Sequence, residues 1–561
     1  MPTVENFEKD AFVNLSIDGL SVTVPKGATI LEAAKATGVI IPTLCDYSGL
    51  KPRAVCRLCV VEVDGGGRLK AACATEATQG AQVVTNNREL MSIRRNVIEL
   101  LLADHPKDCL LCTRNLDCEL QTWAFRLGVR SLPFGEGEAS LKSQLEDTNL
   151  SQNMSKCIKC GRCVAACQDV QETMALCAAN RSIHYEISSP YGKTIAEGPC
   201  VFCGECLTAC PVSALEEKDG ALSLMPSLDK EDIKTAAIFS PQVIVGLEDA
   251  LDYGAGGISS GKMVSALKNL GFDRVYPRDF FRSMAALLEA KELCENLSKE
   301  KKVACVSTCS PYVRAYAAKY YPEAIPFFSS SPNPMELFSM NGRKKGGIFF
   351  EEAETVSFMP CLAQGAEREE AVGIGSQHSY HLTVRDLVKL FKQKNFNIGS
   401  FGYSPFDCPR IFSKNGSMVK EEAMVSEEQL ELARAICELK KVGESGRGYS
   451  RSVPGNGLLE VNLELSSGKS VSFHLVFGMG QAKTSLEEIV KGNLKADYLL
   501  IMACPQGCLE GGGQALKTIH NPHLTREVPN ISNMITKSKL PLEKEVLGAY
   551  GEVYGQVMSL K

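Results

Sequence analysis

Two short runs of regularly spaced cysteines constrain the fold of this chain more than any other feature. Both runs have the spacing C-x2-C-x2-C-x3-C. Because this spacing suits a pair of [4Fe-4S] clusters in which the fourth cysteine of each run binds the other cluster, we expect two clusters in one small domain. The expected ligand sets are Cys157, Cys160, Cys163 and Cys210 for one cluster, and Cys200, Cys203, Cys206 and Cys167 for the other.

A first group of four cysteines lies nearer the N-terminus. It follows a segment whose alternating pattern predicts a hairpin and then a short amphipathic helix over 30–37. Four thiolates on a loop and the following hairpin can hold a [2Fe-2S] cluster, while zinc is the alternative that the C-x2-C pair alone would suit. The four candidate ligands are Cys45, Cys56, Cys59 and Cys73.

A second group, in the run HPKDCLLCTRNLDC, combines one histidine with three cysteines. It follows a helix predicted over 88–104. An imidazole with three thiolates is compatible with zinc or with a [4Fe-4S] cluster, so the spacing leaves both metals open. The candidate ligands are His105, Cys109, Cys112 and Cys118.

The composition narrows the kind of metal chemistry and the kind of partner. The 561 residues include 24 cysteines, and in a reducing cytosol such a number indicates metal ligands rather than disulfides. Cys177, Cys294 and Cys437 are expected to be unpaired core thiols.

The first residues lack the apolar core of a signal peptide, and no apolar run is long enough to span a membrane, so we expect a cytoplasmic protein without membrane insertion. A net charge of -5 does not favour nucleic acid, so redox proteins are the expected partners.

From about residue 235 the sequence alternates between apolar strands and helices. TAAIFS, VACVS, TVSFMP and YLLIMA predict strands, and GKMVSALKNLGF and LEEIVKGNL predict helices. KEEAMVSEEQLELAR predicts an exposed helix. Cys309, Cys361 and Cys504 each come just after a predicted strand, which is where open α/β sheets place their ligands. We therefore expect a site formed by these three cysteines.

Three motifs in this region occur in the order STCSP, FMPCLAQGAE and IMACPQGCLEGGGQ. They resemble T-S-C-C-P, M-P-C-x-x-K-x-x-E and M-A-C-x-x-G-C-x-x-G-G-G-Q of the [FeFe]-hydrogenase catalytic domain, and the resemblance runs from Asn14 to the C-terminus. The N-terminal groups resemble those of multi-cluster hydrogenases and of the large iron–sulfur subunit of respiratory complex I. In both families the histidine and its three cysteines follow the [2Fe-2S] domain, which favours a [4Fe-4S] cluster there.

The resemblance implies an α+β multidomain chain with several metal cofactors. It implies one [2Fe-2S] cluster, three [4Fe-4S] clusters, and an H-cluster made of a [4Fe-4S] cubane and a two-iron subsite. The implied domains are a β-grasp [2Fe-2S] ferredoxin-like domain (1–95), a His/Cys3 [4Fe-4S] domain (96–140), a bacterial two-[4Fe-4S] ferredoxin-like domain (150–225) and a two-lobed α/β hydrogenase-like domain (232–561).

The resemblance also assigns roles around the active site. It implies that Cys361, Cys504 and Cys508 bind the cubane, with Cys508 as the bridge to the two-iron subsite, and it puts Ser310 at the position of the fourth ligand. The residues that it implies for the proton relay are Cys309, Glu289, Glu292 and Ser329. Those that it implies for the surroundings of the two-iron subsite are Met359, Met502, Glu367 and Gln364. On the residues alone, Glu289 and Glu292 equally suit a solvated helix face.

The chain departs from the family pattern at Ser310 (for cysteine), Gln364 (for lysine), Leu500 (for glutamate) and Ala515 (for proline). A serine hydroxyl loses its proton far less readily than a thiol and is a harder ligand. Three outcomes stay open: Ser310 binds weakly, Cys309 becomes the ligand, or the cubane is absent.

Two hypotheses on function follow. In the first, the chain is a hydrogenase that reversibly reduces protons to hydrogen with electrons relayed along its N-terminal clusters. In the second, it is an electron-transfer or sensory subunit with a hydrogenase-like scaffold, without the two-iron centre, in a larger flavin- or NAD(P)-linked redox complex. A free ferredoxin and a flavin- or NAD(P)-dependent subunit are both compatible electron partners. A complex I-like subunit would explain only about the first 220 residues.

Overall fold

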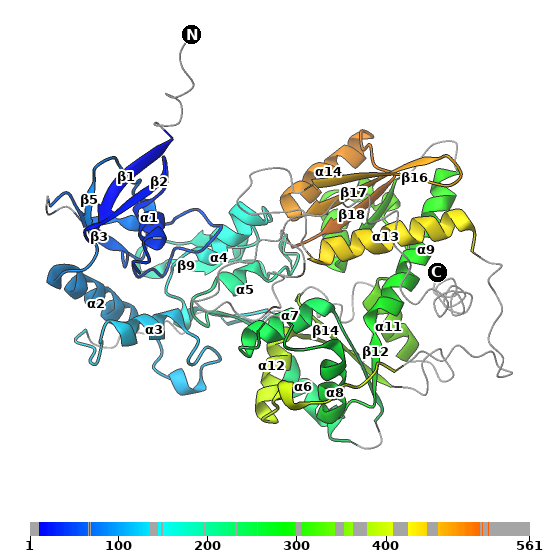
Figure 1. Cartoon of the computed structure of the whole chain (residues 1–561), viewed down its shortest axis with the longest axis horizontal. Helices are drawn as coiled ribbons and strands as arrows, with labels where there is room; N and C mark the ends of the chain where they lie inside the picture. Colours follow the sequence, from blue (N-terminus) through cyan, green and yellow to red (C-terminus); the bar gives the residue numbers. More distant parts are fainter. Residues whose placement is uncertain are drawn as a thin grey trace, which may run out of the picture. The chain divides into compact units, whose positions relative to one another are not determined.

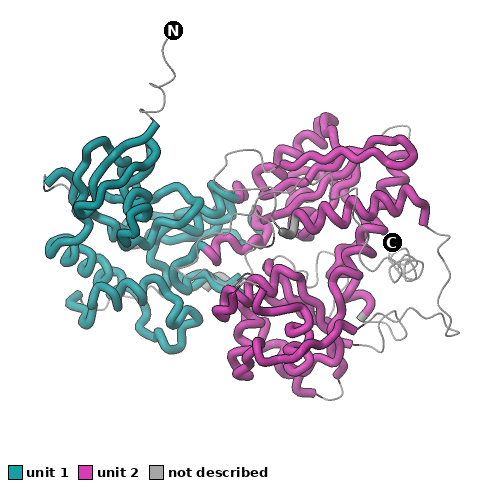
Figure 2. Tube along the Cα trace, in the orientation of Figure 1, with its two compact units in different colours: residues 1–170, 174–198, 209–217 teal, residues 171–173, 199–208, 218–561 magenta. Residues whose placement is uncertain are grey.

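The chain divides into two compact units, which Figure 2 distinguishes by colour. The first comprises residues 1–170, 174–198 and 209–217, and the second comprises 171–173, 199–208 and 218–561. The computed structural model describes residues 11–65, 67, 69–134, 144–146, 150–195, 197–230, 233–254, 256–298, 304–342, 353–362, 379–407, 425–445, 458–504, 508 and 514.

The first unit begins with a five-stranded sheet in the order β2-β1-β5-β3-β4. Its elements are β1 (Phe12–Ile17), β2 (Leu20–Pro25), α1 (Ile30–Ala36), β3 (Val60–Val63), β4 (Leu69–Ala71) and β5 (Gln82–Val84) (Figure 1). β1 and β2 form the expected hairpin. α1 is the expected short helix, and it begins with a capping box in which Thr29 and Glu32 each accept from the other's backbone N–H.

The rest of the first unit consists of short elements that hold cysteine-bearing loops. They are α2 (Arg88–Ala103), α3 (Glu119–Arg126), β6 (Gln144–Glu146), β7 (Leu150–Asn153), α4 (Arg162–Ala165), β8 (Cys177–Ala179), β9 (Glu186–Ser188) and β10 (Leu215–Glu217). α2 is the helix expected over 88–104. β6, β7 and β10 form a three-stranded antiparallel sheet, and β8 pairs with β9. α5 (Glu205–Ala209) contributes residues 205–208 to the second unit.

The described residues of the second unit form two four-stranded sheets. The first has the order β12-β11-β14-β15 and is parallel throughout, and the second has the order β13-β18-β17-β16 with only β16 antiparallel to its neighbour. The strands are β11 (Thr235–Phe239), β12 (Arg274–Pro277), β13 (Cys305–Thr308), β14 (Glu354–Met359), β15 (Ser379–Thr383), β16 (Leu458–Glu464), β17 (Ser470–Phe477) and β18 (Tyr498–Met502). All four strands predicted from the apolar runs are present.

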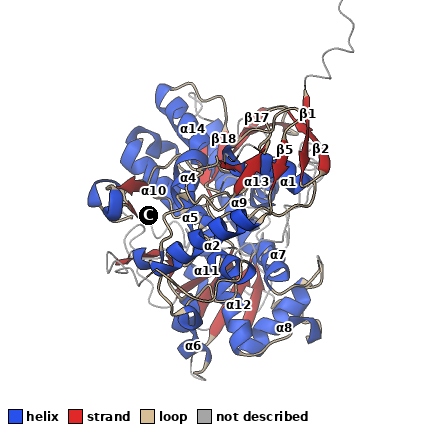
Figure 3. Ribbon diagram, turned by 90° about the vertical axis from the view of Figure 1, so that its left-hand side faces the viewer, coloured by secondary structure: helices blue, strands red, loops and turns tan. Residues whose placement is uncertain are grey.

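Helices cover these sheets, as in other α/β arrangements (Figure 3). They are α6 (Gly220–Leu228), α7 (Pro241–Ala250), α8 (Ser260–Leu270), α9 (Arg278–Leu297), α10 (Pro311–Tyr320), α11 (Pro334–Gly342), α12 (Val384–Gln393), α13 (Glu427–Ser445) and α14 (Met479–Lys491). α8 and α14 contain the two segments predicted to be helical. None of the described helices is long and apolar enough to cross a lipid bilayer.

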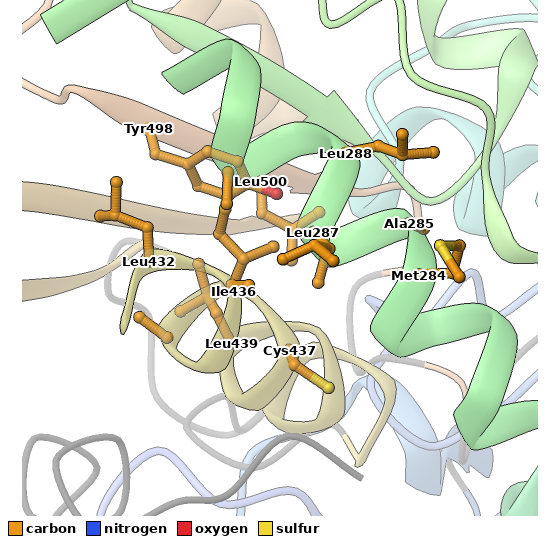
Figure 4. Close-up of a cluster of buried hydrophobic side chains, with 14 of the residues drawn as sticks. Met284, Ala285, Leu287, Leu288, Leu432, Ile436, Cys437, Leu439, Tyr498 and Leu500 are labelled. Carbon is orange, nitrogen blue, oxygen red and sulfur yellow. The ribbon is translucent and has the colours of Figure 1, made fainter. Parts of the chain in front are cut away.

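The long helix α9 links the cores of the two sheets. Its buried residues share one apolar cluster with Ile238 of β11 and with Leu500 of β18. α13 packs along α9, and Figure 4 shows Leu432 and Ile436 of α13 beside Leu500. Polar side chains of α9 are buried among these elements as well, and Ser283 and Glu289 are two of them.

The prediction of an exposed helix in KEEAMVSEEQLELAR is wrong for the part that the structure describes. α13 begins at Glu427, and its Leu432, Ile436 and Leu439 are fully buried. Their spacing of three and four residues puts them on one face of the helix, and this face packs on α9 and β18. The charged residues that suggested exposure occupy the remainder of its surface.

Candidate metal centres and active site

The four N-terminal cysteines of the first unit come together. Cys59 Sγ lies 3.4 Å from Cys73 Sγ, and the thiol of Cys45 is hydrogen-bonded to those of Cys56 and Cys73. These shared bonds lower the pKa of Cys45 and raise the pKa of Cys56 and of Cys73. All four are free thiols, so the donor set suits a thiolate-bound cluster.

The histidine of the second group has the properties of a metal ligand. Burial, and next the charge of Lys156, lower the pKa of His105, which favours the neutral imidazole that metals bind. Its buried Nδ1 has no hydrogen-bond partner among the described residues. Cys109 begins a 3-10 turn after it and Cys112 directly follows that turn, and burial raises the pKa of Cys118. A metal would satisfy this buried nitrogen.

One cavity of the first unit is lined by four cysteines from two distant segments. They are Cys157, Cys160, Cys163 and Cys210, the predicted ligand set of one [4Fe-4S] cluster. Burial raises the pKa of Cys157 to about 11 and that of Cys160 to about 12. Buried thiols of this kind need the positive charge of a metal before they ionise. The cavity thus has the ligands, in one place, that a four-iron cluster requires.

The other predicted [4Fe-4S] set is divided between the two units. Cys200, Cys203 and Cys206 belong to the second unit and Cys167 to the first, so this set stays a prediction. Within the second unit, the ring of Phe202 packs on Tyr312 of α10 with 4.5 Å between centroids. The cysteine loop therefore contacts the helix that begins next to Cys309.

Three strands bring the predicted active-site cysteines together. Cys309 follows β13, Cys361 follows β14 and Cys504 follows β18. Burial raises the pKa of Cys504 well above its usual range, and nearby Cys508, Cys309, Glu205 and Cys361 raise it further. Cys309, Cys361 and Cys508 pack against one apolar cluster, and Cys504 lies near enough to all three for their charges to affect its thiol.

Ser310 has a local structural role. It is buried, and its Oγ accepts a hydrogen bond from the Tyr312 N–H at 3.3 Å, as the N-cap of α10. Pro311 at the first helical position favours the same start. The Sγ of the neighbouring Cys309 instead accepts from the Ala503 N–H at 3.3 Å, one residue before Cys504.

The predicted relay carboxylates do not lie on a solvated face. Glu292 Oε2 accepts from Ser329 Oγ at 2.7 Å. Glu289 is buried, with 3% of its surface exposed, and accepts from Ser307 Oγ at 2.8 Å. The second unit therefore pairs each predicted carboxylate with a hydroxyl.

The predicted surroundings of the two-iron subsite are described in part. Met359 and Met502 are both 2% exposed and share the apolar cluster against which Cys309, Cys361 and Cys508 pack. Gln364, Glu367 and Ala515 lie outside the described residues.

Four segments of the chain match models of known protein families. Residues 233–512 match the iron only hydrogenase large subunit, C-terminal domain. Residues 10–88 match a 2Fe-2S iron-sulfur cluster binding domain, 94–133 the NADH-ubiquinone oxidoreductase-G iron-sulfur binding region, and 148–216 the NADH-quinone oxidoreductase subunit 3, ferredoxin-like domain.

The NADP-reducing hydrogenase subunit HndD of Solidesulfovibrio fructosivorans is 32% identical over 532 residues, which cover 90% of this chain and 89% of that protein. The chain belongs to the iron-only hydrogenase family. Iron hydrogenase 1 of Clostridium pasteurianum is 26% identical over 89% of this chain and 88% of its own length. The NADPH-Fe(3+) oxidoreductase subunit alpha of Geobacter sulfurreducens is 34% identical over 37% of this chain and 24% of that protein.

This member of the iron-only hydrogenase family is an iron–sulfur oxidoreductase with [2Fe-2S] and [4Fe-4S] binding domains. Its relatives include subunits named for reactions of NADP and NADPH. The resemblance stated from STCSP, the M-P-C motif and the M-A-C motif is thereby confirmed at the level of the family.

The sequence reasoning missed several residues of the hydrogenase-like unit. Lys440 and Tyr498 both contact Glu289, and neither belongs to a motif. Gln171, fully buried, donates to the Ala503 carbonyl at 2.9 Å and accepts from the Met479 N–H. One sequence signal could have found Lys440, because this lysine follows Ile436 and Leu439 on the apolar face of a helix. No such signal points to Tyr498 or Gln171.

Proposed function

We propose that this chain reversibly reduces protons to hydrogen at an H-cluster held by the second unit. The observation that carries the proposal is the packing of Cys309, Cys361 and Cys508 against one apolar cluster, with Cys309 Sγ bonded to the N–H of Ala503 beside Cys504. Two buried or half-buried carboxylates with hydroxyl partners lie in the same unit. Metal ligands and proton carriers are the two parts that such a reaction needs from the protein.

The cofactor set of the proposal follows the ligand groups. It comprises a [2Fe-2S] cluster in a β-grasp domain (1–95), a His/Cys3 [4Fe-4S] cluster (96–140), two [4Fe-4S] clusters in a ferredoxin-like domain (150–225) and the H-cluster of a two-lobed domain (232–561). Cys361, Cys504 and Cys508 would hold the cubane. When bound, the two-iron subsite would supply the centre where protons and electrons combine.

The chain's own residues would deliver protons and exclude water. Glu292 and Ser329 form the outer part of the proposed relay, and Glu289 forms its inner part. Cys309 is the proposed last carrier, because its sulfur lies beside the Met-Ala-Cys segment. Met359 and Met502 keep this region apolar, which strengthens the electrostatic interactions within it.

Electron partners are proposed from the relatives. HndD is named a subunit of an NADP-reducing hydrogenase, which supports a flavin- or NAD(P)-dependent subunit as the partner, and a ferredoxin is the alternative. The proposal places this exchange at the N-terminal clusters, in the cytoplasm.

The second candidate function is an electron-transfer or sensory subunit without the two-iron subsite. The capping role of Ser310 favours it, since the position of one cubane ligand is used for helix capping. Iron content separates the candidates after anaerobic expression with hydrogenase maturases. We expect about 20 iron atoms per chain, whereas about 14, or about 18 with a cubane alone, would contradict the first function.

Ser310→Cys provides a test of the fourth ligand position. We expect the variant to lose iron more slowly to a chelator, because a thiolate is a softer ligand for iron than a hydroxyl. Ser310→Ala is the control, since it removes the cap at a cost of about 1 kcal/mol of unfolding free energy without adding a ligand. Equal or faster iron loss from Ser310→Cys than from the unchanged chain would rule out this position as a ligand site.

A further inference from the structure

Glu289 is held by side chains from three different elements. Its Oε1 accepts from Lys440 Nζ of α13 and from Ser307 Oγ of β13, both at 2.8 Å. Its Oε2 accepts from Tyr498 Oη of β18 at 2.6 Å. Figure 4 shows Tyr498 on the side of β18 that faces α9 and α13. The carboxylate therefore receives three donors and is not a freely rotating relay group.

All four members of this network are removed from water. Glu289 is 3% exposed, Lys440 8%, Ser307 4% and Tyr498 fully buried. A buried carboxylate is stable as an anion only when a cation and hydrogen-bond donors compensate for its lost hydration. Burial, followed by the charge of Glu289, raises the pKa of Tyr498 well above its usual range, so this hydroxyl keeps its proton and remains a donor.

Cys305 lies next to this network. It is fully buried at the start of β13 and pairs with Tyr498 across the strands. Burial raises its pKa, the charges of Glu292 and Glu289 raise it further, and a hydrogen bond with Ser329 lowers it. The charges of both carboxylates therefore act on this thiol.

β13 connects the network around Glu289 with the proposed metal site. Cys305 and Ser307 are two positions apart in β13, so they lie on one face of the strand, and Cys309 comes directly after the end of β13. Cys305 belongs to the apolar cluster that α9 and α13 share, so this face turns toward those helices, whereas Cys309 packs against both that cluster and a second one that contains Val306. Ser307, which donates to Glu289, lies two positions before Cys309.

We propose that Lys440 is a positioning residue of the proton relay, which keeps Glu289 ionised and fixed against Ser307. The proposal rests on the hydrogenase function proposed above, because only a relay gives this ion pair a role in turnover. In it, Glu289 gains a proton from the side of Ser329, loses it toward Ser307 and returns to the anion. The titratable groups around Glu289 are Lys440 on α13, Tyr498 on β18 and Cys305 on β13, and Glu292 lies three residues further along α9.

The charge state of Glu289 can be measured without an active H-cluster. Infrared spectra of the full chain as isolated at pH 7 report a protonated carboxyl by its C=O stretching band. We expect Lys440→Met to gain such a band and Lys440→Arg to resemble the unchanged chain. The band should be missing from the double variant Lys440→Met/Glu289→Gln. Both of its side chains are neutral, so it also serves as a folded control if the single variant is destabilised by an unpaired buried charge.

Two spectroscopic outcomes would overturn the proposal. One is the absence of a carboxyl band from a Lys440→Met variant whose cluster absorbance equals that of the unchanged chain. The other is a carboxyl band already present in the unchanged chain and lost in Glu289→Gln.

Hydrogen turnover gives the second readout. In Lys440→Met we expect the pH profile to shift upward, because an opposite charge at this distance favours the ionised carboxyl. Lys440→Arg should restore the original profile, and a merely structural lysine would change stability without moving it. An unmoved profile in active Lys440→Met would overturn the proposal. If every form is inactive while the carboxyl band appears as expected, the proposed hydrogenase function fails and the ionising role of Lys440 stands.

Discussion

Glu289→Gln is expected to lower hydrogen turnover by about 100-fold or more, the range found when a positioned acid or base is removed. The amide keeps the shape of the side chain but cannot accept and release the relayed proton. Hydrogen evolution from a chemical reductant measures the effect without the electron partner. The absorbance of the N-terminal clusters should be unchanged.

This variant needs a stability control, since it leaves Lys440 buried without its anion. Removal of one partner of a buried ion pair costs about 3–5 kcal/mol, so unfolding by denaturant should be measured beside turnover. Glu295→Gln changes an exposed carboxylate on the same helix and should leave both quantities near those of the unchanged chain. Turnover of folded Glu289→Gln within about threefold of the original would remove Glu289 from the relay.

Cys210→Ala is expected to remove one four-iron cluster, which lowers the iron content by about four atoms per chain. Cys210 lines the cavity with Cys157, Cys160 and Cys163, and alanine offers no ligand. The Cys210 carbonyl, which accepts from Arg114, is kept. Turnover driven through the N-terminal clusters should fall with the iron content, because the electron path loses a member.

Cys177→Ala is the matched control for that variant. Cys177 is another free cysteine of the first unit, and it does not line the cavity. Its iron content should equal that of the unchanged chain. If Cys210→Ala also keeps the full iron content and cluster spectrum, the pairing of Cys210 with the first cysteine run is wrong.

The sequence predicted those features that short spacings encode. The β1–β2 hairpin, α1, α2 and the strands before Cys309, Cys361 and Cys504 each follow from a local pattern of apolar residues. The pairing of Cys210 with a run some 50 residues earlier followed from a known ligand spacing, and the cavity is consistent with it.

The network around Glu289 could not be predicted in this way. Lys440 and Tyr498 are 151 and 209 residues from Glu289 in the sequence, and only the packing of α13 and β18 on α9 brings them together. The same packing explains why α13 looked exposed, because its charged residues dominate a local count while Leu432 and Ile436 form the buried face. Ser310 was identified as a changed ligand position, but its capping bond required the backbone of α10.

Infrared spectroscopy of the full chain, after anaerobic expression with hydrogenase maturases, tests the central claim most directly. The resemblance to [FeFe]-hydrogenases implies a two-iron subsite that carries CO and cyanide, whose stretching bands lie apart from those of protein. We expect these bands together with hydrogen evolution. Their absence from a preparation whose N-terminal clusters are intact would contradict the account and would favour a scaffold that transfers electrons without making hydrogen.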